Sequence, residues 1–73
     1  MGRLVRRVLE GEELLAEWSE SEPGSYDAAA ARFRQELEAG HTAARVDGPT
    51  FVSVTELPED AEVVIVTTAM GGG

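Results

Sequence analysis

Residues 3–19, with the sequence RLVRRVLEGEELLAEWS, decide the fold because the same stretch fits two different structures. In a helix, one apolar stripe would hold Leu4, Val8, Leu15 and Trp18. In a hairpin, residues 3–9 and 12–19 would form two strands joined by a turn at Glu10-Gly11. The fold class of the whole chain follows from which of these two structures forms.

Gly11 favours the hairpin. Inside a helix it would cost about 1 kcal/mol relative to alanine, and the glutamates at positions 10, 12 and 13 would crowd like charges around it. A glycine after a tight bend is what a hairpin with a bulge requires. Two strands here would also widen the narrow sheet expected from the rest of the chain. We therefore predict the hairpin, with helical residues 3–18 as the alternative.

The clearest helical pattern follows a polar, acidic loop at residues 19–25 that contains a Pro-Gly pair. One helical stripe is formed by Tyr26, Ala30, Phe33 and Leu37. We expect Ser25 as the N-cap, Asp27 in the first turn and Gly40 as a left-handed C-cap. The pattern predicts a helix over residues 26–39.

Three strands are predicted after this helix, at residues 42–46, 50–57 and 62–68. Turn signals separate them: Asp47-Gly48-Pro49 between the first two, and Pro58-Glu59-Asp60 between the last two. The last strand is rich in β-branched residues and has apolar side chains on both faces. It is therefore expected at the centre of the sheet.

Composition excludes several functions. The 73 residues include 14 acids and 6 bases, all of them Arg, for a formal charge of −8. Such a chain should repel nucleic acid and anionic lipid, so we expect neither as a partner. It has no Cys and one His, His41, which gives no thiolate nucleophile and no cluster of metal ligands. The absence of a signal-peptide pattern makes a cytoplasmic location the expectation, and so small a core leaves little room for an enzyme's deep cavity.

With the hairpin, the order of elements is that of the β-grasp fold, an α+β arrangement. The chain resembles ubiquitin-like proteins over its whole length, through Leu9-Glu10-Gly11 at the first turn, the acidic loop before the helix, Gly40 and the final Gly72-Gly73. Residues 58–73 are also similar to the end of the bacterial sulfur carriers for thiamin and molybdopterin synthesis. The resemblance implies a domain over residues 1–68 and a flexible tail over residues 69–73.

The resemblance also implies a chemistry for the tail. An activating enzyme would adenylate the carboxylate of Gly73 with ATP, and the acyl group would pass to a thiolate and then to an amine or a sulfide. Side chains at the last two positions would crowd this carbonyl, which explains Gly72 and Gly73. Gly71 departs from the family, in which a larger residue usually precedes the pair. The chain would be a monomeric protein substrate, not an enzyme, and would itself bind no cofactor.

Three functions stay open from the sequence. The first is a ubiquitin-like modifier, whose partners would be the adenylating enzyme, a conjugating enzyme, a deconjugating metallopeptidase and target proteins. The second is a sulfur carrier with a thiocarboxylate at Gly73. The third is a small interaction protein, such as an antitoxin, with two helices before the strands and an inert tail. This third function requires residues 3–18 to be helical.

Several other residues have expected places. Trp18 and Phe33 should be core residues, and His41 should lie at the negative end of the helix. A solvated acidic edge, or a docking surface for a basic partner, is expected from Glu10, Glu12, Glu13, Glu20 and Glu22. A basic spot that serves solubility or protects a sheet edge is expected from Arg3, Arg6 and Arg7. In the ubiquitin family an apolar patch on the open sheet face recruits receptors. Leu9 could match it, but the third strand offers only Ala43 and Ala44, so we do not predict receptor binding.

Overall fold

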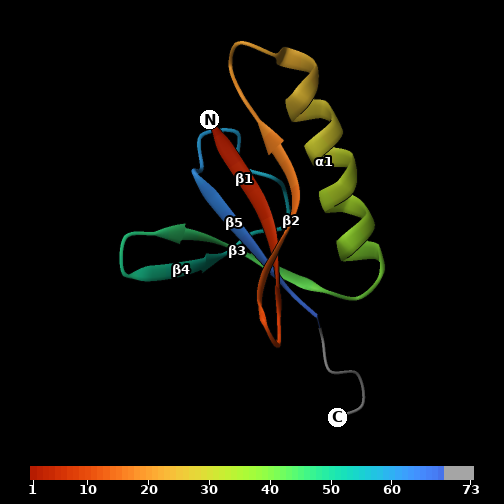
Figure 1. Ribbon diagram of the computed structural model, residues 1–73, viewed down its shortest axis with the longest axis vertical. Coiled ribbons are helices and arrows are strands. Elements are labelled where there is room, and N and C mark those ends of the chain that lie inside the picture. Colours follow the sequence, from red (N-terminus) through yellow and green to blue (C-terminus); the bar gives the residue numbers. More distant parts are fainter. Residues whose placement is uncertain (69–73) are drawn as a thin grey trace.

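The computed structural model describes residues 1–68 and shows an α+β fold, with a mixed five-stranded sheet and a helix packed on one of its faces (Figure 1). The elements in chain order are β1 Gly2–Val8, β2 Gly11–Trp18, α1 Pro23–Glu38, β3 Thr42–Asp47, β4 Thr50–Ser53 and β5 Val63–Thr67. Tail residues 69–73 lie outside the described residues. We call the sheet face opposite α1 the open face.

The N-terminal segment is a hairpin, so the prediction is confirmed and the helical alternative for residues 3–18 is wrong. Its turn is one residue earlier than predicted: Val8 pairs with Gly11 around Leu9-Glu10. Gly11 has φ +138°, which L side chains rarely adopt and glycine adopts freely. The bulge lies elsewhere, at Leu15, where the register shifts between Leu4 and Val5. This extra residue lets β2 present Leu14 to the open face.

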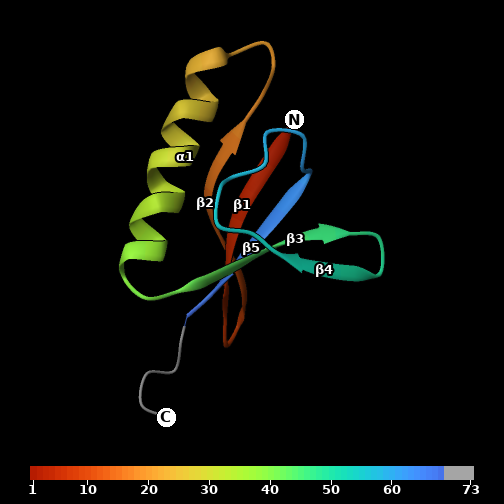
Figure 2. The ribbon, with the colours of Figure 1, turned by 180° about the vertical axis from the view of Figure 1, so that it is seen from behind.

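The strands follow the order β2-β1-β5-β3-β4 across the sheet, so β5 is central as predicted (Figure 2). β5 runs parallel to β1 and antiparallel to β3. Its Val64 and Val66 are fully buried on the helix side, while Ile65 faces the other way and is 8% exposed. Apolar residues on both faces of β5 therefore correspond to its central position.

The helix begins earlier than predicted. α1 starts at Pro23, which is favourable at the first helical position because the missing N–H has no helical partner there. Glu22 is the N-cap residue, so the predictions of Ser25 as N-cap and Asp27 in the first turn are wrong. Ser25 instead uses its hydroxyl to accept the Ser19 N–H at 2.9 Å, which ties the loop to the helix.

The helix ends at Glu38, one residue earlier than predicted, and Gly40 takes the predicted left-handed position after it. Gly40 has φ +93°, and its N–H donates to the Leu37 carbonyl at 3.0 Å. The His41 N–H donates to the Glu36 carbonyl at 3.1 Å. These two bonds make a Schellman motif, which satisfies the last helical carbonyls and turns the chain into β3.

The core lies between α1 and the sheet. Trp18 and Phe33 are each 3% exposed, which confirms both as core residues. They belong to one cluster with Leu4, Ala29, Ala43, Leu57, Ala61, Val64 and Val66. Ala43 therefore belongs to the core, while Ala44 lies on the open face and Leu9 is fully exposed at the β1–β2 turn. Leu9, Ala43 and Ala44 therefore form no common patch, in agreement with the absence of a receptor-binding prediction.

The strand predicted over residues 50–57 ends at Ser53. Val54 still donates its N–H to the Ala43 carbonyl at 3.0 Å; the chain then leaves the sheet, and Leu57 is buried in the core at 5% exposure. The turn at Pro58 forms as expected, with the Ala61 N–H donating to the Pro58 carbonyl at 3.2 Å. Burial of Leu57 thus takes precedence over continued pairing with β3. Within residues 1–68, no helix has the length and apolar character needed to cross a membrane.

Candidate functional site

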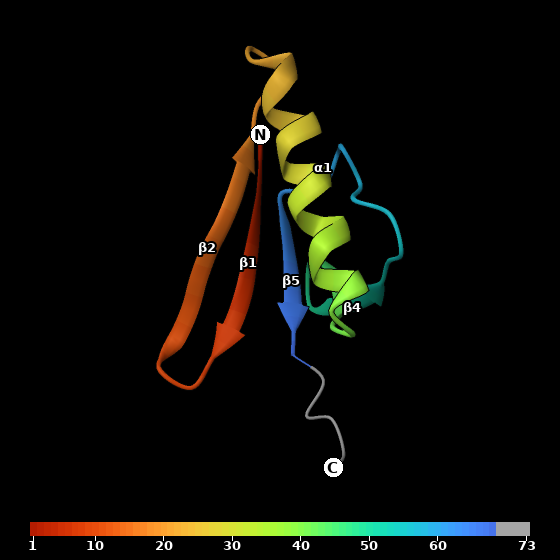
Figure 3. The same cartoon turned by 90° about the vertical axis from the view of Figure 1, so that its right-hand side faces the viewer.

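The chain leaves the sheet at the end of β5, and Thr68 is the last described residue. The predicted functional residues Gly71, Gly72 and Gly73 lie outside the described residues. β5 runs parallel to β1, so it ends beside the β1–β2 turn and the C-terminal end of α1 (Figure 3). We call this end of the molecule the tail base. What the structure describes is therefore the platform from which the tail starts.

A buried carboxylate organises the tail base. Glu36 on α1 is 6% exposed, and its Oε1 lies 3.0 Å from Nδ1 of His41. Arg6 Nη1 lies 3.8 Å from the same oxygen, and Arg32 Nη2 lies 3.6 Å from Oε2. Arg6 also forms an ion pair with Glu13 of β2. A buried carboxylate is expensive unless it is paired, and these neighbours supply the compensation.

This cluster adjoins the start of the tail. Arg6 is the register partner of Val66, and Thr42, next to His41, is the partner of Thr67. The helix end, β1 and the start of β3 are thus bound together where β5 leaves the sheet. The expectation that His41 lies at the helix end is confirmed. Its contact with Glu36 was not predicted, because the two side chains meet only through the Schellman turn.

The basic spot does not form as predicted. Arg3 and Arg7 are exposed on the open face, while Arg6 lies on the helix side and is partly buried against Glu36. β1 lies between β2 and β5, so protection of a sheet edge by these arginines is wrong. The five glutamates expected at the acidic edge are all exposed.

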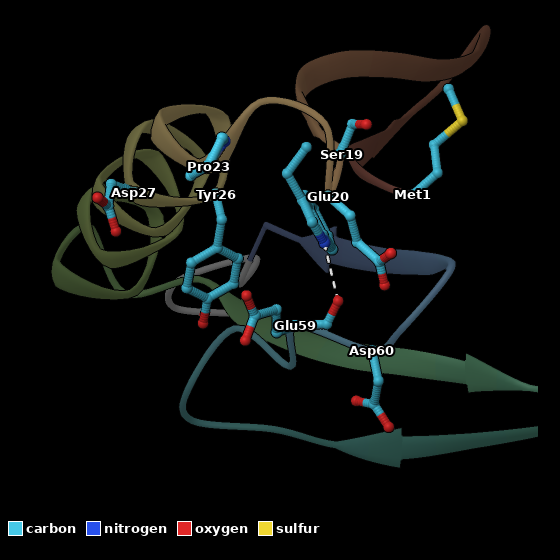
Figure 4. A pocket seen from close by; sticks show the side chains of 9 residues that line it. Met1, Ser19, Glu20, Pro23, Tyr26, Asp27, Glu59 and Asp60 are labelled. Carbon is cyan, nitrogen blue, oxygen red and sulfur yellow. Dashed lines mark hydrogen bonds between the residues drawn. The ribbon is translucent and has the colours of Figure 1, made fainter.

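A hollow of about 590 Å³ lies at the opposite end of the molecule, beside the N-terminus of α1 (Figure 4). Its lining includes Met1, Ser19, Pro23, Trp18, Tyr26 and the four acids Glu20, Asp27, Glu59 and Asp60. Trp18 and Tyr26 meet edge to face with ring centroids 6.2 Å apart. The Trp18 Nε1–H donates to the Glu59 carbonyl at 3.1 Å, and the Tyr26 hydroxyl donates to the Leu57 carbonyl.

The acids in and near this hollow affect the pKa of Tyr26. Desolvation on burial raises the pKa of Tyr26, and the nearby charges of Glu59, Glu56 and Asp27 raise it further. Both polar aromatic groups are already bound to backbone carbonyls. Trp18 therefore ties the loop before β5 to β2, and Tyr26 ties it to α1, so neither group is a free proton donor for a substrate.

The open face is the third candidate surface. Across the strands, one register row contains Leu14, Val5, Ile65, Ala44 and Ser53. A shallow hollow of about 200 Å³ near this row is lined by Arg7, Ala44, Phe51, Ile65 and Thr67. Phe51 is 60% exposed and Val52 47%. The exposure of these two residues was not predicted, although large apolar residues on a short strand next to a Gly-Pro turn could have suggested an exposed hairpin.

Among residues 1–68, no three side chains from His, Cys, Asp and Glu are arranged to hold a metal ion. Comparisons with protein-family models, with curated proteins and with solved structures gave no match to this chain.

Proposed function

We propose that this chain is a ubiquitin-like modifier of β-grasp fold, which is activated at the carboxyl group of Gly73 and transferred to an amine of a target protein. The observation that supports this most is the sheet order β2-β1-β5-β3-β4 with α1 on one face. This order is compatible with the β-grasp fold that the resemblance implies, and it places β5, which precedes the glycine tail, at the centre of the sheet.

The proposed chemistry needs no catalytic group on this chain. The Gly73 carboxylate attacks the α-phosphorus of ATP in the activating enzyme, forming an acyl adenylate and releasing pyrophosphate. A thiolate of a partner then displaces AMP and forms a thioester. A target amine displaces that thiolate, loses a proton and forms the amide. Gly71, Gly72 and Gly73 carry no side chain that would hinder these attacks.

The platform matters because the tail must reach a partner's active site while the domain stays folded. β5 is hydrogen-bonded to neighbours on both sides, and its Val64 and Val66 are 0% exposed. The paired charges around Glu36 reinforce the same end of the molecule. A well-packed base next to a tail that ends in three glycines suits a protein that is passed from one enzyme to another.

Mass spectrometry tests the proposal on protein tagged at its N-terminus and purified from its own host under denaturing conditions. A glutamate-specific protease cleaves after Glu62, the last acid of the chain, and should leave residues 63–73 attached to target lysines. Branched peptides of this kind support the modifier. If they are absent and the free protein carries sulfur in place of one terminal oxygen, the chain is a sulfur carrier instead. If neither product forms, the tail is inert.

A further inference from the structure

The two edges of the sheet differ in a way that the proposed function does not explain. An exposed edge strand invites pairing with another chain, and proteins usually block it with charges, prolines or bulges. The β2 edge carries the exposed acids Glu12, Glu13 and Glu17 and the bulge at Leu15. β4 carries neither a charge nor a proline, and all four of its residues, Thr50–Ser53, are exposed. The β4 edge is thus unprotected.

The hairpin of β3 and β4 extends sideways from the rest of the molecule, away from both α1 and the end of β5 (Figures 1 and 2). Its two-residue turn contains Gly48, whose φ of +60° suits the first turn position of a type II′ hairpin. The hairpin is therefore well formed, although Phe51 and Val52 remain 60% and 47% exposed.

The register identifies which backbone groups face outward. The Val54 N–H donates to the Ala43 carbonyl at 3.0 Å, so this pair is hydrogen-bonded. Hydrogen-bonded and non-hydrogen-bonded pairs alternate along an antiparallel ladder. Val52 and Thr50 are therefore bonded to β3 through their pairs with Arg45 and Asp47. The N–H and C=O groups of Phe51 and Ser53 point away from β3, toward the open edge.

We propose that this edge binds a second copy of the chain, with β4 pairing antiparallel to β4 about a two-fold axis at Val52. One sheet would then run through both copies. This proposal rests on the β4 edge and is independent of the chemistry at Gly73. It replaces the monomer expected from the resemblance with a reversible dimer.

The geometry of β4 favours a second copy of β4 as the partner and favours the register with the axis at Val52. With the axis at Val52, Phe51 of each copy lies opposite Ser53 of the other, and both residues have outward N–H and C=O groups to exchange. An axis at Phe51 would place Ser53 opposite Pro49, which has no N–H. An axis at Ser53 would place Phe51 opposite Thr55, which lies outside β4. The register at Val52 thus uses the whole strand.

The side chains complement each other in the same register. The open-face row Leu14, Val5, Ile65, Ala44 and Ser53 ends in two small residues at the edge. Phe51 of the second copy would extend this row beside Ser53, and the two Val52 side chains would face each other. β4 is also an uncharged edge on a chain of charge −8, so pairing there sets no like charges opposite one another. A single pair of short strands belongs to the small, transient class of interface.

Sedimentation of the full chain tests the proposal over a range from about 10 μM to about 1 mM, where weak complexes form. We expect the weight-average mass to rise from that of a monomer toward that of a dimer. In a mixed sample of isotope-labelled and unlabelled protein, an NMR cross-peak should connect the Val52 α-protons of the two copies, because facing residues of a non-hydrogen-bonded pair lie close together.

Three variants locate the interface. Val52→Lys places two like charges opposite each other, and Ser53→Pro removes an outward N–H without touching the bonds to β3; both should remain monomeric and folded. Thr55→Lys makes the same change of charge at an exposed residue outside β4 and should still dimerise. A wild-type chain that stays monomeric at the highest concentration would overturn the proposal. So would a dimer that persists unchanged in both β4 variants.

Discussion

Nδ1 of His41 lies 3.0 Å from Oε1 of Glu36, joining the first residue after the helix turn to a carboxylate buried in the last turns of α1. Glu36 also faces Arg6 of β1 and Arg32 of its own helix. One carboxylate thus connects α1, β1 and the start of β3. These contacts hold the helix end against the sheet where the chain departs toward its glycine tail.

Removal of this carboxylate should destabilise the domain. Glu36→Ala leaves Arg6, Arg32 and His41 without their shared partner, and we expect a loss of about 1–3 kcal/mol in the free energy of unfolding. Partial exposure of the two arginines limits the loss. Urea denaturation followed by circular dichroism measures it. Glu38→Ala, at an exposed position of the same helix, should change stability by less than about 0.5 kcal/mol. Equal effects of the two substitutions would show that the cluster contributes nothing.

Gly2 is predicted to be intolerant of any side chain. A Cβ at this position would lie 2.2 Å from Cζ2 of Trp18 and 2.6 Å from the Ala61 carbonyl oxygen. Gly2→Ala should therefore displace the Trp18 ring and cost about 1–3 kcal/mol by overpacking. Gly24→Ala is the matched control, because a Cβ there meets no atom within 4 Å and Gly24 lies in α1. The control should be neutral or stabilising by up to about 1 kcal/mol. A Gly2→Ala protein as stable as wild type, with unchanged Trp fluorescence, would contradict the packing described.

Tyr26 should make stability depend on alkaline pH. Its pKa is raised by burial and by Glu59, Glu56 and Asp27 above the ordinary value of 10.0. The folded state thus favours the neutral phenol, so the associated stability is complete below pH 10.0 and is lost as the pH rises through the raised pKa. Tyr26 is the chain's one tyrosine, so ultraviolet absorbance follows it directly. If the midpoint of the Tyr26 titration were the same in the folded protein as in the urea-unfolded protein, the prediction would be refuted. Tyr26→Phe should remove this alkaline loss.

The absence of lysine predicts the form of any conjugate. A modifier without Lys offers no side-chain amine to a second copy, so each attachment point should carry one copy. Gels of purified conjugates should show single additions, even after the deconjugating activity is inhibited. A ladder of copies linked through side chains would be incompatible with this sequence.

The sequence predicted the elements better than their ends. Gly11 and the narrow sheet expected from the later strands together favoured the hairpin, and Gly11 adopts a positive φ directly after the turn, as glycine does readily. The Pro-Gly pair at Pro23 predicts a loop, but proline is equally suited to the first residue of a helix, which is where the structure has it. The alternation of residues 50–57 could not show that Leu57 leaves the sheet to fill the core, because that depends on tertiary packing.

The candidate site divides in the same way. The terminal glycines could be singled out from the sequence, because the role proposed for them depends on residue type and on position at the end of the chain. The contact of His41 with Glu36 and the outward groups of Phe51 and Ser53 depend on register and helix termination. Such relationships join residues that no local pattern connects, and only the fold brings them together.

Blocking the Gly73 carboxyl group and counting the conjugates tests directly whether this carbon carries the function. Three tagged proteins would be purified from the host: the wild type, a Gly73→Phe variant and a variant with one alanine added after Gly73. Target peptides that carry residues 63–73 as a branch would then be quantified. For the third protein, the branch sought would include the added alanine. We expect branched peptides from the wild type and none from either variant, while all three proteins remain folded by circular dichroism. Equal yields from the three proteins would show that the function does not depend on that carbon.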